Sequence, residues 1–203
     1  MLIRRISARS SVLLPLGDTI LQRRLVTVLN LNVVGDLLMR SVDQRCILDA
    51  GRRAEAEPML REALSICRDA GMQFCGPKVL SALSRTVEDS GERASLLAEG
   101  NALLLRGSVG HNHLWFYRDA IEAYLTAGDA RGALEYVGRL EEYTCSEPLT
   151  WADLFAARGH ALAAAQPDGP SEAVRRDLIR VRTALGQAGM AAFLPPVDSA
   201  LGK

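Results

Sequence analysis

His111 and His113 are the side chains in this sequence that most resemble a pair of metal ligands, and only Asn112 separates them. Both rings could reach one ion in an extended strand or loop, but on a helix positions i and i+2 point apart. No Asp, Glu or Cys lies close in the sequence to complete a ligand set. We therefore predict no metal and no cofactor at these weak candidates. The alternative is that Asn112 or His113 caps the helix that follows.

Nucleophilic catalysis finds no support either. The four cysteines form no C-x-x-C pair, which argues against zinc-ribbon and thioredoxin-like chemistry; they are Cys46, Cys67, Cys75 and Cys145. The sequence contains no G-x-S-x-G elbow and no G-x-x-x-x-G-K-S/T phosphate loop. We predict that the protein is not an enzyme and that its thiols are reduced, which fits a cytoplasmic location.

A third group of side chains could bind a partner. A helical frame counted back from the glycines described below places cations at matching positions along one face: Arg45, Lys78, Arg85 and Arg118. The same frame brings Trp115, Arg118 and Glu122 together, and an exposed Trp beside Arg is typical of binding hot spots. Our hypothesis is that this face lines a groove for an acidic peptide or the acidic face of a neighbouring domain. The alternatives are a solvated charged face without consequence and a Trp115 that packs on the preceding unit.

The elements that must position these residues are repeated along the chain. Glycines lie 40, 37 and 41 residues apart, and each follows one helically spaced apolar stretch and precedes another: Gly51, Gly91, Gly128 and Gly169. This spacing is typical of stacked helix-turn-helix units. We predict an all-α fold of antiparallel helix-turn-helix repeats, an α-solenoid of about four helix pairs in which each unit buries its apolar face on its neighbours.

Apolar residues recur at helical spacing within each unit. The predicted buried stripe of the first unit is Ala56, Leu60, Ala63 and Leu64, and those of the third are Leu114, Tyr117, Ile121, Tyr124 and Leu125 with Ala133, Leu134, Val137 and Leu140. The predicted parts of the chain are an irregular arm at 1–17, a helical segment that matches the repeat poorly at 18–50, the repeat domain at 51–188, and a tail or short helix at 189–203.

Several residues predict where individual helices begin and end. Asp129 and Ser171 can each cap the helix that follows by accepting a hydrogen bond from a free N–H group. Thr150, with Asp153 three residues later, is similar to a capping box. Gly189 is expected to end the last long helix.

The stretch GRRAEAEPMLREALSIC resembles the second half of a tetratricopeptide repeat. That motif needs Gly in the turn between its helices and small residues in the second helix, which allow two helices to approach closely. The matching positions are Gly51, Ala56, Leu60, Ala63 and Leu64, and in the third unit Tyr124, Gly128, Ala133 and Val137. Pro58 departs from the motif, so we expect the second helix of the first unit to begin near Glu57.

The stretches GSVGHNHLWFYRDAIEAYLTAGD and EEYTCSEPLTWADLFAARGHALA resemble the C-terminal helical-repeat region of bacterial multidomain signalling ATPases, including those with an adenylate or guanylate cyclase domain and related LuxR-type regulators. In that group the repeat region senses signals or docks partners, while catalysis lies in other domains. The resemblance implies the regulatory part of a signalling protein, either a protein-interaction scaffold or a module that senses a small ligand and relays binding to an effector.

Composition limits the kinds of partner. Among 203 residues, Lys and Arg together number 24 and so do Asp and Glu, so the chain carries no net charge and has no global attraction to nucleic acid. No segment approaches the ~18 consecutive apolar residues of a membrane span. The predicted partner is therefore a protein or peptide, neither nucleic acid nor membrane. An uncapped end of the array would also pair with a second copy of the chain.

Overall fold

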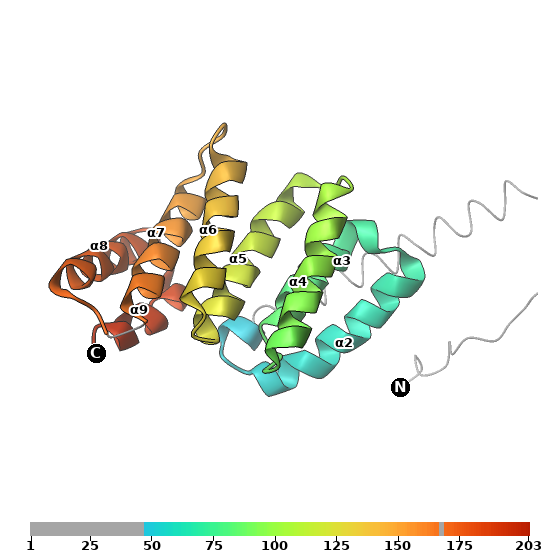
Figure 1. Ribbon diagram of the computed structural model, residues 1–203, viewed down its shortest axis with the longest axis horizontal. Helices are drawn as coiled ribbons and strands as arrows, with labels where there is room; N and C mark the ends of the chain where they lie inside the picture. Colours follow the sequence, from blue (N-terminus) through green and yellow to red (C-terminus); the bar gives the residue numbers. More distant parts are fainter. Residues whose placement is uncertain (1–46, 167–168) are drawn as a thin grey trace, which may run out of the picture.

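The computed structural model describes residues 47–166 and 169–203, and every regular element in these ranges is helical (Figure 1). In chain order they are α2 (Arg53–Ala70), α3 (Met72–Ser84), α4 (Ser90–Leu105), α5 (Gly110–Thr126), α6 (Ala130–Thr144), α7 (Thr150–Ala165), α8 (Glu172–Gln187), η1 (Ala191–Phe193) and α9 (Pro195–Ala200). The all-α prediction is confirmed for this part of the chain. The predicted arm, nearly all of the segment at 18–50, Arg45 and Cys46 lie outside the described residues.

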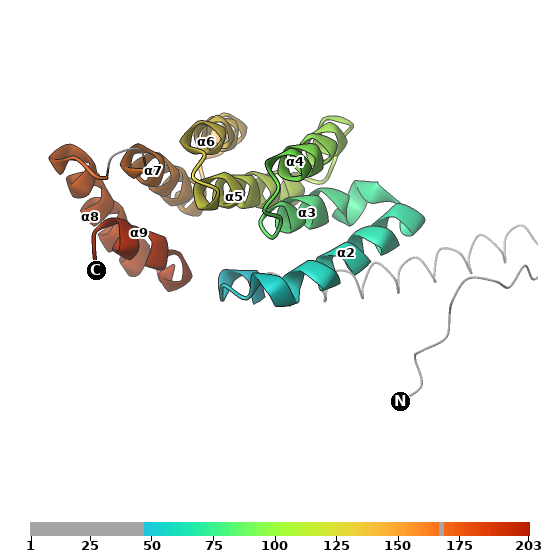
Figure 2. The ribbon, with the colours of Figure 1, turned by 60° about the horizontal axis from the view of Figure 1, so that its bottom comes forward.

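The helices pack in pairs, and the pairs lie side by side. α3 contacts α4, α5 contacts α6 and α7 contacts α8, while α3 with α5 and α5 with α7 make contacts between pairs. Figure 2 shows α3, α5 and α7 in one row with α4 and α6 on one side, and α2 and α8 turning toward the other side at the two ends. We call the face of the row that is turned away from α4 and α6 the inner face.

The predicted apolar stripes of α2 and α6 are mostly buried, whereas that of α5 is not. All four members of the α2 stripe are buried, as are Ala133, Val137 and Leu140 of α6, but Leu134 is 41% exposed and its predicted burial is wrong. In α5 only Ile121 of the predicted stripe is fully buried, together with Phe116 and Ala120, which the stripe omitted. α5 contacts α3, α4, α6 and α7, so a single apolar stripe does not describe it.

Positive-φ glycines mark three of the four predicted turns. Gly51, Gly128 and Gly169 have φ of 77°, 73° and 78°, a region that side chains rarely adopt. Gly91 instead lies in the first turn of α4, and the turn predicted there is wrong. Asp89 caps that helix, because its carboxylate accepts a hydrogen bond from the backbone N–H of Glu92 at 2.6 Å.

Two predicted caps are confirmed and one is wrong. Asp129 accepts from the N–H of Gly132 at 2.9 Å, and Ser171 accepts from Val174 at 3.3 Å. Thr150 is already the first residue of α7, and Leu149 precedes it without any side-chain cap. The predicted end of α8 is confirmed, since Gly189, with φ of 71°, follows its C-cap residue Ala188.

Pro58 does not set the start of α2, contrary to the prediction. The helix begins at Arg53 and runs through the proline. Proline removes one backbone N–H donor. The buried side chains of Ala56 and Leu60 lie on either side of Pro58 and hold α2 against the core. Tertiary packing of an apolar face supplies most helical stability in proteins, so it outweighs one missing hydrogen bond.

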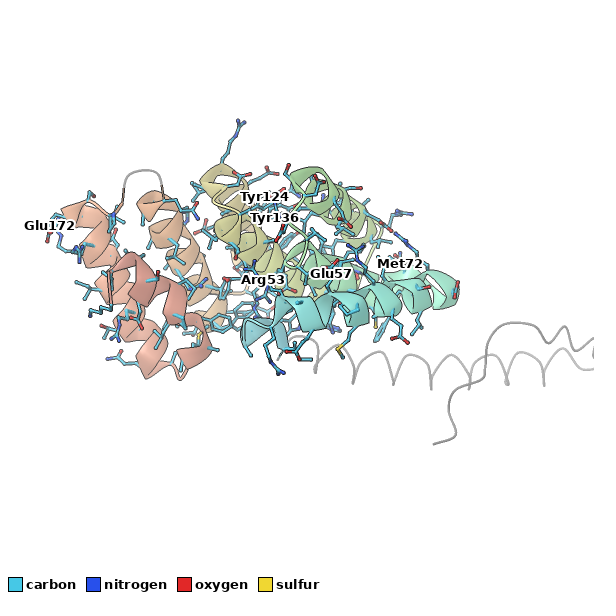
Figure 3. All side chains as sticks on the ribbon, turned by 90° about the horizontal axis from the view of Figure 1, so that it is seen from below. Arg53, Glu57, Met72, Tyr124, Tyr136 and Glu172 are labelled. Atoms are coloured by element: carbon cyan, nitrogen blue, oxygen red, sulfur yellow. The ribbon has the colours of Figure 1, made fainter. Side chains whose placement is uncertain are left out.

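Two aromatic contacts show how closely the helices approach. Tyr124 of α5 stacks on Tyr136 of α6, with ring centroids 5.8 Å apart (Figure 3). Gly100 of α4 lies against the buried ring of Phe116, and a Cβ atom at Gly100 would come within 2.3 Å of Phe116 Cε2. The glycine therefore leaves the space that the phenylalanine ring occupies.

We expect Gly100→Ala to destabilise the fold by about 1–3 kcal/mol, because the fully buried Phe116 ring must move to admit the methyl group. Urea unfolding followed by circular dichroism measures this. Gly138→Ala is the matched control, since nothing lies within 4 Å of a Cβ at this exposed position of α6. The control should gain about 0.5–1 kcal/mol from helix propensity. Equal effects of the two changes would contradict the packing seen at Gly100.

Candidate binding pocket on the inner face

A charge network joins the start of the described chain to α3 and α5. Nη2 of Arg118 donates to both carboxylate oxygens of Asp49 at 2.7 Å, and Nη2 of Arg85 donates to Oδ1 of Asp49 at 3.0 Å. Nη1 of Arg85 also donates to Oδ1 of Asp119 at 3.2 Å, and Ser81 Oγ donates to Oδ2 of Asp119 at 3.2 Å. Each guanidinium in the network therefore has a carboxylate partner.

Two charged residues of this network are shielded from water. Arg118 is 4% exposed and Asp119 is fully buried. Burial acts to raise the pKa of Asp49, but the positive charges of Arg118 and Arg85 and their hydrogen bonds act against it, so the pKa of Asp49 lies below its ordinary value. Asp49 is therefore ionised in the folded protein at neutral pH.

A second ion pair, between Arg158 and Glu122, lies next to the segment that follows α8. The guanidinium of Arg158 on α7 is 1% exposed and is bound by the Glu122 carboxylate of α5 through two of its nitrogens. Its Nε donates to the backbone carbonyl oxygen of Phe193 at 3.0 Å. This bond places η1 against α7, where the Phe193 ring meets the Phe155 ring edge-on at a centroid distance of 5.2 Å.

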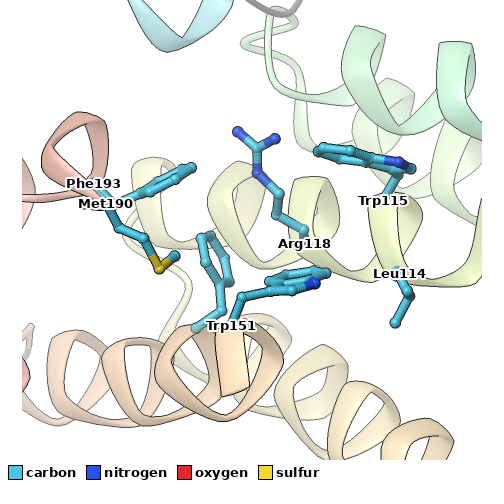
Figure 4. A pocket seen from close by; sticks show the side chains of 7 residues that line it. Leu114, Trp115, Arg118, Trp151, Met190 and Phe193 are labelled. Carbon is cyan, nitrogen blue, oxygen red and sulfur yellow. The ribbon is translucent and has the colours of Figure 1, made fainter. Parts of the chain in front are cut away.

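Arg118 and four aromatic rings form a pocket on α5, α7 and η1 (Figure 4). Its volume is about 300 Å³. Besides Arg118, the residues that line it are Leu114, Trp115, Trp151, Phe155, Met190 and Phe193. The Arg118 guanidinium carbon lies 4.9 Å from the ring centroid of Phe193 and 5.4 Å from that of Trp115. Trp115 stacks on Trp151 at 6.5 Å and remains 37% exposed. The pocket is therefore mainly apolar, and the Arg118 side chain is the charged group in its lining.

The structure places the predicted binding residues in different settings. Trp115 and Arg118 lie together in the pocket, whereas Glu122 is paired with Arg158. Arg85 is partly buried and bound in the charge network, and half-buried Lys78 lies elsewhere on α3, outside the pocket lining. Trp115 stacks on Trp151 of the following helix pair. The acidic-peptide hypothesis stays a prediction, but Arg85 and Arg118 already have internal counter-ions.

Sequence reasoning missed the residues that complete the site. Asp49 and Asp119 are counter-ions of the arginines, Arg158 is the counter-ion of Glu122, and Phe193 lines the pocket from beyond α8. One signal was present for Arg158, because it stands in the Ala-rich stretch AARGHALAAA, where closely packed helices leave little room for an unpaired charge. The position of Phe193 depends on tertiary contacts that no local pattern encodes.

The histidine pair lies within the first turn of α5, where the loop arrangement that a metal site requires is not formed. His113 stacks on Tyr143 at 4.5 Å, and burial lowers the pKa of both His111 and His113. The predicted cap is wrong, since Val109 precedes the helix and Asn112 Nδ2 donates to the carbonyl of Phe74 at 2.8 Å. In residues 47–166 and 169–203 no three His, Cys, Asp or Glu side chains could hold a metal ion together.

Comparison with protein-family models, with curated proteins and with solved structures finds no match for this chain. The resemblances to tetratricopeptide repeats and to signalling ATPases therefore stay predictions. In the described ranges, every helix is too short or too polar to cross a membrane.

Asp49→Asn should destabilise the protein by about 3 kcal/mol at pH 7, because it leaves buried guanidinium charge uncompensated. The lowered pKa of Asp49 fixes the sign of the pH dependence. Its stabilisation is fully present above the unfolded pKa of about 3.9 and is lost as the pH falls toward the lower folded pKa. The difference between wild type and variant in urea unfolding should therefore be constant above about pH 5 and shrink below pH 4.

The matched control for this change is Asp177→Asn, which breaks the exposed pair with Arg180 on α8. Exposed ion pairs contribute little, so no measurable change is expected there. A difference between wild type and Asp49→Asn that stayed constant down to pH 2 would show that Asp49 is not held by these cations.

Thiol labelling should separate the described cysteines in a Cys46→Ser background. Cys145 is exposed, whereas burial raises the pKa of Cys67 to about 12 and also raises that of Cys75. Because the thiolate is the reactive species, Ellman's reagent should modify Cys145 at once and the other two only upon unfolding. Cys145→Ser should abolish the fast phase, and rapid native labelling of Cys67 would contradict the packing of α2.

Proposed function

We propose that this protein is a non-enzymatic interaction scaffold, an α-solenoid of the tetratricopeptide type whose inner face binds a segment of a partner protein. The observation that carries the proposal is the apolar pocket around Trp115, Trp151 and Phe193. Binding sites are typically concave and mainly apolar, with a small number of polar groups that fix orientation. In a signalling protein such a scaffold would be the regulatory part, as the sequence resemblance implies.

The size of the pocket favours a peptide anchor. Its volume of about 300 Å³ lies at the small end of the range for ligand sites. That space suits one or two amino-acid side chains. Trp115 lines the pocket and is 37% exposed, so a bound segment would cover part of its ring. Large aromatic residues beside arginine are the groups that most often dominate binding energy at protein interfaces.

A second candidate function is the sensing of a small ligand by the same pocket, favoured by the guanidinium of Arg118 in its wall. A ligand raises the melting temperature of the state that it binds. A thermal-shift screen against metabolites tests this alternative, and a saturable shift with one compound class would support the sensor over the scaffold.

Selection from a random peptide library displayed on phage tests the scaffold directly. Peptides selected on the wild-type protein should bind Trp115→Ala at least about 10-fold more weakly, because that change removes an exposed aromatic wall of the pocket. Fluorescence anisotropy of the labelled peptides measures the affinity. The control is Leu134→Ala, which removes a side chain of similar exposure from α6, outside the pocket.

The control variant should bind the selected peptides as tightly as the wild type does. Circular dichroism shows whether both variants retain their helical content. Peptides that bind the Trp115→Ala variant unchanged, or a library that yields no binder, would count against the scaffold.

A further inference from the structure

A second pocket lies where the start of α2, the residues that connect α3 to α4, and the end of α5 meet. Its volume is about 320 Å³, and it shares no lining residue with the aromatic pocket. Three arginines contribute to its lining, namely Arg53, Arg85 and Arg93, and so do the hydroxyl side chains of Ser90 and Thr126. We call it the arginine pocket. Its lining is rich in positive charge and in hydrogen-bond donors.

Arg93 is a buried cation that has no carboxylate partner among the described residues. It is 8% exposed, and its Nη2 donates to the backbone carbonyl oxygens of Val87 and Glu88 at 3.0 and 3.1 Å. Arg118 and Arg158, the other deeply buried arginines of the described ranges, each form an ion pair with a carboxylate. Carbonyl oxygens carry no net charge, so the positive charge of Arg93 is left uncompensated.

Two further nitrogens of Arg93 are accessible to a guest. Its Nε and Nη1 donate to no described residue. In the part of the chain that the structure describes, the side-chain polar atoms that are fully enclosed and lack a partner belong to Asn112, Arg118 and Gln166. Nε and Nη1 of Arg93 are not among these atoms, so they keep contact with solvent. Because Arg93 lines the arginine pocket, a guest there can replace that solvent.

Arg53 adds a second unpaired cation to the lining. Its side chain is exposed and forms no hydrogen bond or ion pair with a described residue. Arg85 is already bound by Asp49 and Asp119, and Glu88 is the acidic side chain of the lining. Positive charge therefore exceeds negative charge, and a pocket with such an excess attracts anions.

We propose that the arginine pocket binds a phosphate group, as the free ion or as part of a phosphate ester, with Arg93 and Arg53 as its charged donors. Guanidinium groups form short, charge-assisted hydrogen bonds with phosphate oxygens. A phosphate group carries about −1.5 to −2 charges at neutral pH, so it can offset both unpaired cations, whereas a carboxylate offsets only one. The hydroxyls of Ser90 and Thr126 supply neutral donors. This inference concerns a different site from the scaffold function and does not rest on it.

The test is a titration of the ¹⁵N-labelled full-length protein with sodium phosphate at neutral pH and constant ionic strength, followed through the arginine Nε–H signals. Arg93→Lys, which keeps the charge and lacks the guanidinium, assigns the Arg93 signal. We expect a saturable shift of that signal with phosphate and with phenyl phosphate. Acetate, which carries a single charge, should bind at least about 5-fold more weakly.

Arg53→Ala is the decisive variant, because Arg53 is exposed and its replacement leaves the core untouched. It should weaken phosphate binding about 10-fold, which corresponds to one hydrogen bond to a charged group. The matched control is Arg52→Ala, which removes the same charge from the adjacent residue. Arg52 is paired with Glu55 and lies outside the pocket lining, so its replacement should change the Kd by less than about 2-fold. Glu88→Gln should tighten binding, because it removes the acidic side chain from the lining.

The outcomes that would overturn the inference are distinct. One is the absence of a saturable response to both phosphate and phenyl phosphate. Another is equal weakening by Arg52→Ala and Arg53→Ala, which would show general charge attraction instead of a site. Acetate that binds as tightly as phosphate would reject phosphate as the guest. A preference for phenyl phosphate would support a phosphate ester, and a preference for the free ion would support inorganic phosphate. The peptide selection tests the aromatic pocket independently of all these results.

Discussion

The ion pair between Arg118 and Asp49 is the interaction on which the inner face depends. A guanidinium that is 4% exposed requires a counter-ion at contact distance, and Asp49 meets it with both oxygens at 2.7 Å. Arg85 binds the same carboxylate, and Asp119 then balances Arg85. These ion pairs connect α3, α5 and the residues just before α2 in one network.

The same need for a counter-ion determines the packing at the C-terminal end of the helices. Arg158 is almost fully buried on α7, and its partners are the Glu122 carboxylate and the Phe193 carbonyl. That carbonyl bond holds η1 across α7, so the Phe193 ring lies over both guanidinium groups, 4.9 Å from that of Arg118 and 5.9 Å from that of Arg158. The Phe193 ring in the wall of the pocket is therefore positioned by the ion-paired Arg158.

Local patterns predicted the helices well and the site only in part. Apolar spacing identified the buried stripe of α2, and polar residues identified the caps at Asp129 and Ser171. The sequence pattern gave wrong predictions where tertiary contacts determine the structure. α5 is surrounded by other helices, Gly91 lies inside a helix, and Pro58 is held in α2 by its neighbours. Trp115 and Arg118 lie together as the helical frame predicted, but Asp49, the counter-ion of Arg118, is 69 positions away in the chain and no periodicity connects the two.

The positions of the arginines also show why a line of cations on a helical surface is weak evidence for an acidic partner. Arg85 and Arg118 have helical positions that suit a basic groove, yet each is bound to carboxylates of its own chain. Their charge is used to hold helices together, and the pocket offers a guest mainly aromatic ring surface. Recognition of the proposed peptide would then depend on shape and on apolar contact, both of which persist at high salt because neither relies on long-range attraction.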